Sequence, residues 1–406
     1  MSRASNTRGF SLIELMMATT IALVVIAGAV SAGTYLQRRS YLEERTMETQ
    51  NAARAARDFF TPSLQRAGEG FGSSPLYLGG APGELRYAIN VTSAAGASAG
   101  YVPPSGAYTA LRSDVLEIFE ADSARALRMN RCGSGGSDAR HGNTSPLCLT
   151  TQAPPGTEAG LPTGTVLVAA DPQVRGACVG VALAQRNITI PPALSSNNIA
   201  WAVGAPGATP FNNNSFCTNV SPSPLWEVNG NDEDALLMPV TSRIYRVNWS
   251  QGRPALELDP DGSLGPAEFQ VLSEEIEQLR VRLGVATLEA PNTPLRYFPD
   301  PAAIPARPAI DQCTNAQCWG LIPGDAGTMG AQDYGPGSAR DELMRRVRVV
   351  ELLVTARSAR PDRQAARGAP DAGMLPSDDE GNPDDGYKRR HFLIRVTPRN
   401  FGYAGG

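Results

Sequence analysis

The chain has 406 residues, more than one hydrophobic core usually covers, so we expect two or three domains or one domain with large insertions. Glycine and proline are abundant, at 41 and 33 residues, which favours short strands, turns and long loops over a helix-rich enzyme. The net charge of -4 gives no reason to expect a nucleic-acid partner, and only two histidines, His141 and His391, are present to build a histidine-based metal or hydrolase site.

The N-terminus contains an apolar segment long enough to cross a membrane. No charged residue occurs from Leu15 to Leu36, and at about 1.5 Å per residue this stretch would span roughly 33 Å as a helix. Arginines precede and follow it, so its flanks do not decide its orientation. A secretory signal would place small residues for cleavage after the apolar region, whereas this one runs directly into an Arg-, Glu- and Gln-rich segment. We therefore predict one retained membrane span.

Residues at the start of this segment suggest how it is processed. Gly9 lies immediately before the apolar run, where a peptidase could remove only the leader and keep the helix. Glu14 is the fifth residue counted from Phe10, and a carboxylate in hydrocarbon is costly unless a cation accompanies it. The free α-amino group of Phe10 in a neighbouring subunit could be that cation.

The sequence from Arg8 to Leu15, together with the uninterrupted apolar stretch, resembles the type IV prepilin signature. The resemblance implies that an inner-membrane prepilin peptidase cuts between Gly9 and Phe10 and that the new amine of Phe10 is methylated. It further implies that Glu14 pairs with the N-terminus of another subunit during filament assembly. The alternative is an ordinary signal anchor in which Glu14 has no such role.

The segment from Gln37 to Arg66 is predicted to continue the helix as an amphipathic half, with Pro62 as its one helix-breaking residue. Apolar residues at near-helical spacing predict a stripe that packs on a sheet: Leu42, Met47, Ala52, Ala55, Ala56, Phe59, Phe60 and Leu64. The chain is thus predicted to consist of a leader (1–9), a membrane and assembly helix (10–36), an amphipathic half-helix (37–66) and a β-rich head (67–406).

Alternation of apolar and polar residues predicts half-buried antiparallel strands in the head, over 115–119, 279–283 and 347–349. Residues 243–249 and 255–258 are predicted to form a hairpin whose Gln251-Gly252 turn gives access to positive φ. A sheet of such strands could pack on the helical stripe, which makes the expected fold class α+β. The intervening long segments are predicted to be insertions: 70–106, 133–160, 191–234, 289–332 and 360–386.

Several segments are similar to PilW-type minor pilins, with GspJ-type pseudopilins as the neighbouring group. Residues 51–72 resemble the Arg- and Ala-rich helix end and Ala-Gly-aromatic-Gly turn of these proteins, although Glu69 and Gly70 precede the aromatic residue and Pro62 interrupts where the family continues the helix. Segments similar to the strands of the family are 113–119, 165–171, 271–285, 347–357 and 389–400, the last ending in Arg-Asn. The resemblance implies a type IV pilin fold, in which a long N-terminal helix packs on an antiparallel sheet.

The six cysteines all follow the membrane span, on the side exported to an oxidising compartment, and their even number favours disulfides. The sequence leaves the pairing open. Near neighbours are the preferred pairs because each pair brackets a loop that needs restraint: Cys132 with Cys148, Cys178 with Cys217, and Cys313 with Cys318. Only the last pair is close in sequence, which disfavours a zinc site.

Two acidic loops carry the hard oxygen ligands and glycine turns that calcium binding requires. One is 259–263, and the other is 378–386, with Asp378, Asp379 and Asp384 as its candidate ligands. Neither loop has complete EF-hand spacing, so a solvated turn is the alternative for both. No other cofactor is expected.

The pilin resemblance implies a non-catalytic minor pilin that takes part in initiation or tip assembly of type IV pili, and hence in motility and adhesion. A head as large as 67–406 would crowd a filament repeated along its length, which favours the tip over the shaft. The implied partners are other minor pilins, the major pilin, the prepilin peptidase and a PilY-type tip adhesin, with no nucleic acid. The protein would be a single-pass inner-membrane protein with a periplasmic head before it reaches the pilus at the cell surface.

Other functions stay open at this point. A type II secretion pseudopilin at the tip of the periplasmic pseudopilus would share the architecture. A membrane-anchored enzyme belongs to a different class, and the sequence lacks the Gly-x-Ser-x-Gly, P-loop and metal signatures that would support it. The net charge argues against a DNA-uptake receptor.

Overall fold

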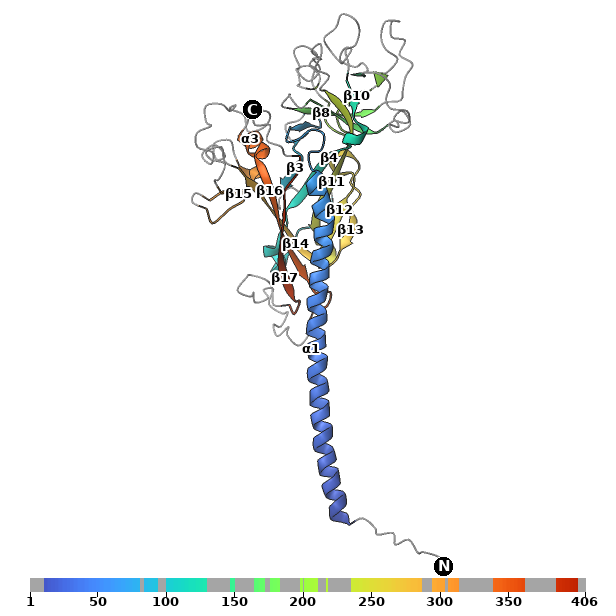
Figure 1. The fold of residues 1–406 in the computed structure, drawn as a ribbon, viewed down its shortest axis with the longest axis vertical. Helices are drawn as coiled ribbons and strands as arrows, with labels where there is room; N and C mark the ends of the chain where they lie inside the picture. The colour runs from blue at the N-terminus through green and yellow to red at the C-terminus, as the bar shows by residue number, and fades with distance from the viewer. Residues whose placement is uncertain are drawn as a thin grey trace, which may run out of the picture.

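The computed structural model describes residues 11–80, 84–93, 100–129, 147–149, 164–171, 176–182, 198–199, 201–210, 217, 235–286, 294–303, 306–313, 339–361 and 385–400. A long helix, α1 (Leu12–Arg66), projects from a β-rich head (Figure 1). Its N-terminal part extends away from the head, and its C-terminal turns lie against the strands. The predicted α+β fold class is therefore confirmed, and the arrangement is consistent with a type IV pilin fold.

Helix α1 continues to Arg66, as predicted for the segment 37–66, and Pro62 does not interrupt it. Proline removes one helical N–H and crowds the preceding turn, which normally costs about 3 kcal/mol or more. On either side of it, Phe60 and Leu64 are fully buried in the core of the head. We infer that this packing holds the last turns in helical geometry despite the missing hydrogen bond.

The buried face of α1 differs from the predicted stripe. Ala56, Phe60 and Leu64 are buried as expected, but four members of the stripe are exposed: Leu42, Met47, Ala55 and Phe59. The buried face begins with two polar residues, Arg45 and Thr49, and continues through Ala53. The helix carries apolar side chains on more than one side, and the position of the head, rather than hydrophobicity, selects which side is buried.

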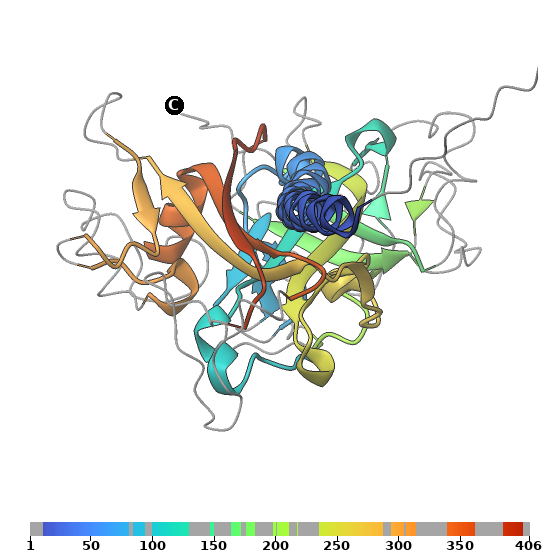
Figure 2. The same cartoon turned by 90° about the horizontal axis from the view of Figure 1, so that it is seen from below.

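The larger sheet has eleven strands and forms one half of the head (Figure 2). Its main path runs β13-β12-β11-β7-β8-β1-β2, and β3, β4, β5 and β10 pair off this path. The described pairings are antiparallel except for β1 with β8. The strands are β1 (Leu76–Tyr77), β2 (Leu85–Arg86), β3 (Ile89–Thr92), β4 (Val115–Ala121), β5 (Leu127–Arg128), β7 (Val166–Ala170), β8 (Ala177–Ala182), β10 (Trp201–Val203), β11 (Leu236–Asn248), β12 (Ala255–Asp259) and β13 (Gln270–Ser273).

A second sheet of four antiparallel strands has the order β15-β14-β16-β17. Its strands are β14 (Ile276–Val285), β15 (Arg296–Phe298), β16 (Val347–Arg357) and β17 (Arg389–Val396), and α3 (Ala339–Arg345) precedes β16. A separate pair consists of β6 (Leu147–Cys148) and β9 (Asn198–Ile199). Five short 3-10 helices complete the described elements: η2 (Gly106–Leu111), η3 (Ser123–Arg125), η5 (Ser250–Gly252), η6 (Gly262–Leu264) and η7 (Ile310–Gln312).

Two strand predictions have contrasting outcomes. The hairpin is confirmed, since β11 and β12 pair antiparallel and Gly252 adopts a φ of 72° between them. The segment 271–285, expected as one strand, forms β13 in the large sheet and β14 in the second sheet. The break falls at Ser273, whose side chain accepts a hydrogen bond from the amide of Glu275 at 3.2 Å and donates one to its carboxylate at 2.7 Å. Such a local side-chain turn competes with continued strand pairing.

Candidate assembly segment and its support

Helix α1 begins with a capping box formed by Ser11 and Glu14. The Ser11 hydroxyl accepts a hydrogen bond from the amide of Glu14 at 3.2 Å, and the Glu14 carboxylate accepts one from the amide of Ser11 at 3.0 Å. The carboxylate also lies in the first turn, where the helix dipole favours negative charge. The Ser-x-x-Glu pattern is a known sequence signature of a helix start. It could have identified Ser11, which the sequence analysis missed.

The geometry places the Glu14 carboxylate at the very start of the helix. It contacts the backbone of Ser11, the residue that directly follows Phe10. A carboxylate has about four acceptor positions, so the bond to Ser11 leaves capacity for a cation. Gly9 and Phe10 themselves lie outside the described residues.

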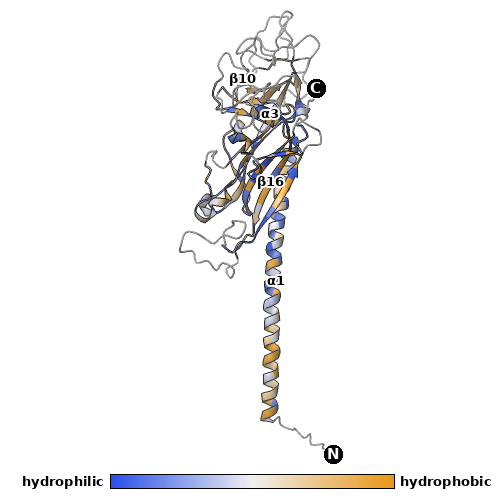
Figure 3. Cartoon of the chain, turned by 90° about the vertical axis from the view of Figure 1, so that its left-hand side faces the viewer, coloured by the Kyte–Doolittle hydropathy of each residue, from blue (hydrophilic) through white to orange (hydrophobic). Residues whose placement is uncertain are grey.

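The first half of α1 exposes a continuous apolar surface, seen as the orange part of the helix in Figure 3. The exposed fraction of Leu12 is 79%, and that of Ile26, in the middle of the segment, is 58%. Within the described part of the chain, α1 is the one helix long and apolar enough to cross a membrane. A surface of this size and character needs lipid or other helices to cover it.

Residues 4–30, which include Gly9, Phe10 and Glu14, match the family described as the prokaryotic N-terminal methylation motif. The chain is type IV pilin-like. No curated protein and no solved structure matches this chain. The motif implies processing by prepilin peptidase and assembly with other pilins, and it is typical of structural subunits without catalytic activity.

The motif and the apolar helix together indicate where the pilin-like chain is located. Its N-terminal helix anchors it in the inner membrane as a single-pass protein, and the chain then assembles with other pilin-like subunits. If the helix joins an assembly, the head moves with it only if the two are firmly joined. Contacts near the C-terminal end of α1 and near its middle join them.

The upper contact surrounds the last turns of α1. The ring of Phe60 lies 4.8 Å from that of Tyr245 on β11, and the Tyr245 hydroxyl is 3.2 Å from the hydroxyl of Ser63. Burial raises the pKa of Tyr245, so the phenol stays neutral. Arg243 donates to Ser63 at 3.1 Å and pairs with Glu120 at 2.9 Å. These bonds join the helix to both β11 and β4.

Residues that follow β17 add to the same contact. The side chain of Asn400 donates to the carbonyls of Arg66 and Ala67 at 3.2 and 3.4 Å, and the amide of Arg399 donates to the carbonyl of Gln65 at 3.1 Å. Carbonyls in the last turn of a helix have no partner within the helix, so these bonds act as a cap supplied from the far end of the sequence. The Arg-Asn that ends the segment 389–400 therefore has a structural role.

Helix α1 is followed by Ala67 and Gly68, where the chain turns toward the strands of the head. Gly68 adopts a φ of 74° and donates to the carbonyl of Phe119 on β4 at 3.0 Å. A Cβ at this position would collide with the carbonyl of Gly72. Glycine is therefore required here.

The lower contact lies where the segments flanking 362–384 meet α1. The Lys388 ammonium donates to the hydroxyl of Thr46 at 2.6 Å, and the amide of Ala359 donates to the Glu48 carboxylate at 3.3 Å. The amide of Ser358 donates to the carbonyl of Lys388 at 2.9 Å, which ties the two segments to each other. The helix is thus held at its middle as well as at its end.

A buried ion cluster links β17 to β14 across the intervening strand β16. Arg389 donates to the Glu277 carboxylate at 2.6 and 2.9 Å and to the Asp385 carboxylate at 2.7 Å through two nitrogens. Burial by itself would raise the pKa of Asp385, but the hydrogen bonds and charge of Arg389 outweigh it and hold that pKa below its ordinary value. Tyr108 donates to Asp385 at 3.1 Å, and burial together with that negative charge raises the pKa of Tyr108 to about 12.

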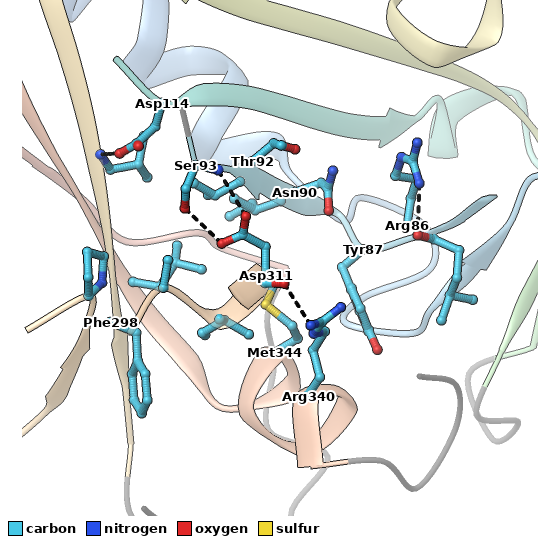
Figure 4. Close-up of a pocket in the computed structure, with 18 residues that line it drawn as sticks. Arg86, Tyr87, Asn90, Thr92, Ser93, Asp114, Phe298, Asp311, Arg340 and Met344 are labelled. Carbon is cyan, nitrogen blue, oxygen red and sulfur yellow. Dashed lines mark hydrogen bonds between the residues drawn. The ribbon is translucent and has the colours of Figure 1, made fainter. Parts of the chain in front are cut away.

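A cavity of about 270 Å³ is lined by residues of β3, β14, η7 and α3, among others (Figure 4). The Asp311 carboxylate accepts hydrogen bonds from the amide and hydroxyl of Ser93 at 2.9 and 3.0 Å, and Arg340 donates to the Asp311 carbonyl at 2.8 Å. On the other wall, Asp114 accepts the amide of Val281 at 2.8 Å. These carboxylates therefore join segments of the head to one another.

The cysteine predictions can be compared with the structure at four positions. Cys178 and Cys217, one of the preferred pairs, form a disulfide that closes 39 residues. Cys148 and Cys313 are disulfide-bonded as well. Cys132 and Cys318, their preferred partners, lie outside the described residues, so those two pairings stay predictions.

The two acidic loops have different outcomes. In the first, Asp259 is buried at the end of β12 and accepts the amide of Asp261 at 3.3 Å, which makes it part of a turn. Within the described ranges, no group of three or more His, Cys, Asp or Glu residues could hold a metal ion. The candidate ligands of the second loop lie outside those ranges: Asp378, Asp379 and Asp384.

Proposed function

We propose that this protein is a minor pilin of the PilW type that takes part in initiating type IV pili and remains at the pilus tip. The observation that carries the proposal is the methylation motif at 4–30 on a helix whose apolar half lies entirely outside a large head. A subunit of this design joins a filament through the helix and presents the head at its surface.

The size of the head supports the tip rather than the shaft. Viewed along α1, the head extends well beyond the helix on several sides (Figure 2). In a shaft, each helix would have neighbouring helices around it, and heads of this breadth would compete for the same space. At the tip, a single copy has no subunit above it.

In this proposal, Glu14 sets the register of assembly. Helix packing within a membrane gains little from apolar transfer, because lipid and protein are similarly apolar, so specific polar contacts weigh more. Pairing of Glu14 with the methylated amine of a neighbouring Phe10 would neutralise both charges in the hydrocarbon. The capping box already holds this carboxylate at the start of the helix.

Substitutions at three positions test the proposal. Gly9→Ala should block removal of the leader, which an immunoblot detects as an uncut precursor. Glu14→Gln keeps an acceptor for the capping box but removes the charge, so this variant should be cleaved yet be absent from sheared pili. Ser11→Ala is the matched control, since it removes the cap but keeps the carboxylate, and it should still enter pili.

Three results would contradict the proposal. Normal cleavage of Gly9→Ala would exclude the assigned processing site. Equal incorporation of Glu14→Gln and wild-type protein into pili would exclude the charge pair. Recovery of the wild-type protein with secretion pseudopilins instead of pilins, by crosslinking in cells, would move it to the type II secretion system.

A further inference from the structure

One face of the four-stranded sheet points away from α1 and the core. Its central residues form two rungs across three strands: Arg280, Leu353 and Leu393 in one, and Arg282, Glu351 and Arg395 in the other. We name these six residues the outer sheet face. Since side chains alternate along a strand, their neighbours point inward, and Val281, Leu352 and Ile394 belong to the same core as Phe60 of α1.

The outer sheet face combines an apolar centre with exposed cations. Leu353 and Leu393 lie directly opposite each other with exposed fractions of 37% and 52%. The side chains of Arg280, Arg282 and Arg395 have exposed fractions of 44%, 40% and 64%. A molecule that approaches this face therefore meets two leucines bordered by three guanidinium groups.

The carboxylates beneath these arginines are recessed. Glu351 is 2% exposed and lies 2.7 Å from Arg395 and 3.6 Å from Arg282. Asp114, also buried, lies 3.6 Å from Arg280. Each arginine is thus paired with a buried carboxylate, most closely at Arg395, while part of its side chain faces solvent. Fixed arginines lose less conformational freedom on binding than free ones, which is favourable for an interface.

An aromatic ring extends the same face. Arg282 lies over the ring of Tyr297 on β15, with 4.9 Å between the guanidinium carbon and the ring centroid. Tryptophan, tyrosine and arginine are the residues most enriched at positions that dominate binding energy, and such positions lie near the desolvated centre of an interface. The leucine pair supplies that centre.

We propose that the outer sheet face binds a different protein subunit of the filament tip, one whose matching surface carries carboxylates around an apolar centre. This inference rests on the proposed function. Charge complementarity selects an acidic partner, because the exposed ionic groups of the face are arginines. A phosphate backbone would satisfy the arginines but leave the leucines uncovered, which favours a protein over a nucleic acid.

The position of the face also suits this role. Helix α1 packs on the opposite side of the sheet, so bundling of pilin helices leaves the outer sheet face accessible. Figure 3 shows the molecule from the side on which β16 and its neighbours lie, with the helix extending below. A lateral partner could therefore bind here without displacing the helix.

Photocrosslinking of the full-length protein in pilus-producing cells tests the contact. The variant Leu353→p-benzoylphenylalanine should crosslink to a second protein after irradiation, and peptide mass spectrometry should place the crosslink in an acidic segment. Val271→p-benzoylphenylalanine is the matched control. Val271 is 58% exposed on β13, an edge strand of the other sheet, and should give no such product.

The charge of the partner's surface is tested by adding a second substitution to the Leu353 crosslinking variant. Leu393→Glu and Leu393→Lys both remove the apolar side chain, but only glutamate repels an acidic partner. We expect Leu393→Glu to reduce crosslinking about tenfold relative to Leu393→Lys, a difference of about 1.4 kcal/mol. The position is half exposed, so neither variant should prevent folding, and the abundance of the protein in cells checks this.

Several results would overturn the inference. One is an equal loss of crosslinking in Leu393→Glu and Leu393→Lys. Another is a crosslink to DNA or to a second copy of this chain. The last is the absence of any crosslink although the protein is present in sheared pili. The last result would leave the proposed function intact. A crosslink to an acidic partner combined with absence from pili would instead retain the binding surface and reject the pilus assignment.

Discussion

The neighbouring residues Phe59 and Phe60 allow a sharp test of how α1 is held by the head. Phe60 is fully buried, and its ring stacks at a tilt on Tyr245, whereas Phe59 is 40% exposed. Phe60→Ala should lower the free energy of unfolding of the head by about 3–5 kcal/mol, from lost burial, a new cavity and the lost aromatic pair. Phe59→Ala should cost less than about 1 kcal/mol.

The two variants gain the same helix propensity, so their difference isolates the tertiary contact. The assay is urea unfolding of the full-length protein in detergent micelles, followed by tryptophan fluorescence, with Trp249 as a buried reporter in the head. A lower urea midpoint for Phe60→Ala alone is the expected result. Equal midpoints for the two variants would refute the assigned orientation of the helix.

Three further predictions concern the head. Cys178→Ser opens a loop of 39 residues and should lower stability by about 4 kcal/mol, measured as the urea midpoint under non-reducing conditions; an unchanged midpoint would contradict it. Arg389→Met leaves two buried carboxylates without their main partner and should cost about 3–5 kcal/mol by the same assay, while Arg390→Met, at a half-buried neighbour, should cost far less. The raised pKa of Tyr108, about 12, means that the folded state holds this proton more tightly than the unfolded state, whose pKa is about 10. Its contribution to stability is thus complete below pH 10 and should be lost between about pH 10 and pH 12, and Tyr108→Phe should flatten this part of the pH profile.

Sequence reasoning located the N-terminal features because they are local. The apolar run, Gly9 and Glu14 have a fixed spacing along the chain, and residues 4–30 match a family on this basis. The hairpin of β11 and β12 was predictable for the same reason, since one glycine provides the positive φ that the turn needs. The capping serine was equally readable from the Ser-x-x-Glu pattern.

The remaining features depend on partners that are distant in sequence. Asn400 caps a helix that ends at Arg66, and Arg389 is buried because Glu277 and Asp385 surround it. No periodicity within 389–400 distinguishes an arginine on a solvated face from one in a buried ion cluster. The cost of burying the charge is met only when the folded chain brings the carboxylates within hydrogen-bond distance.

The sequence alone determined that this chain has a membrane helix with a processing motif and a β-rich head. The tertiary structure decided which face of α1 is buried and which face of the four-stranded sheet remains open. The physical reason is that both elements are apolar on more than one side, as Phe59 with Phe60 and Leu352 with Leu353 illustrate. Hydrophobicity identifies such side chains, but only the packing of the head against α1 determines which of them leave water.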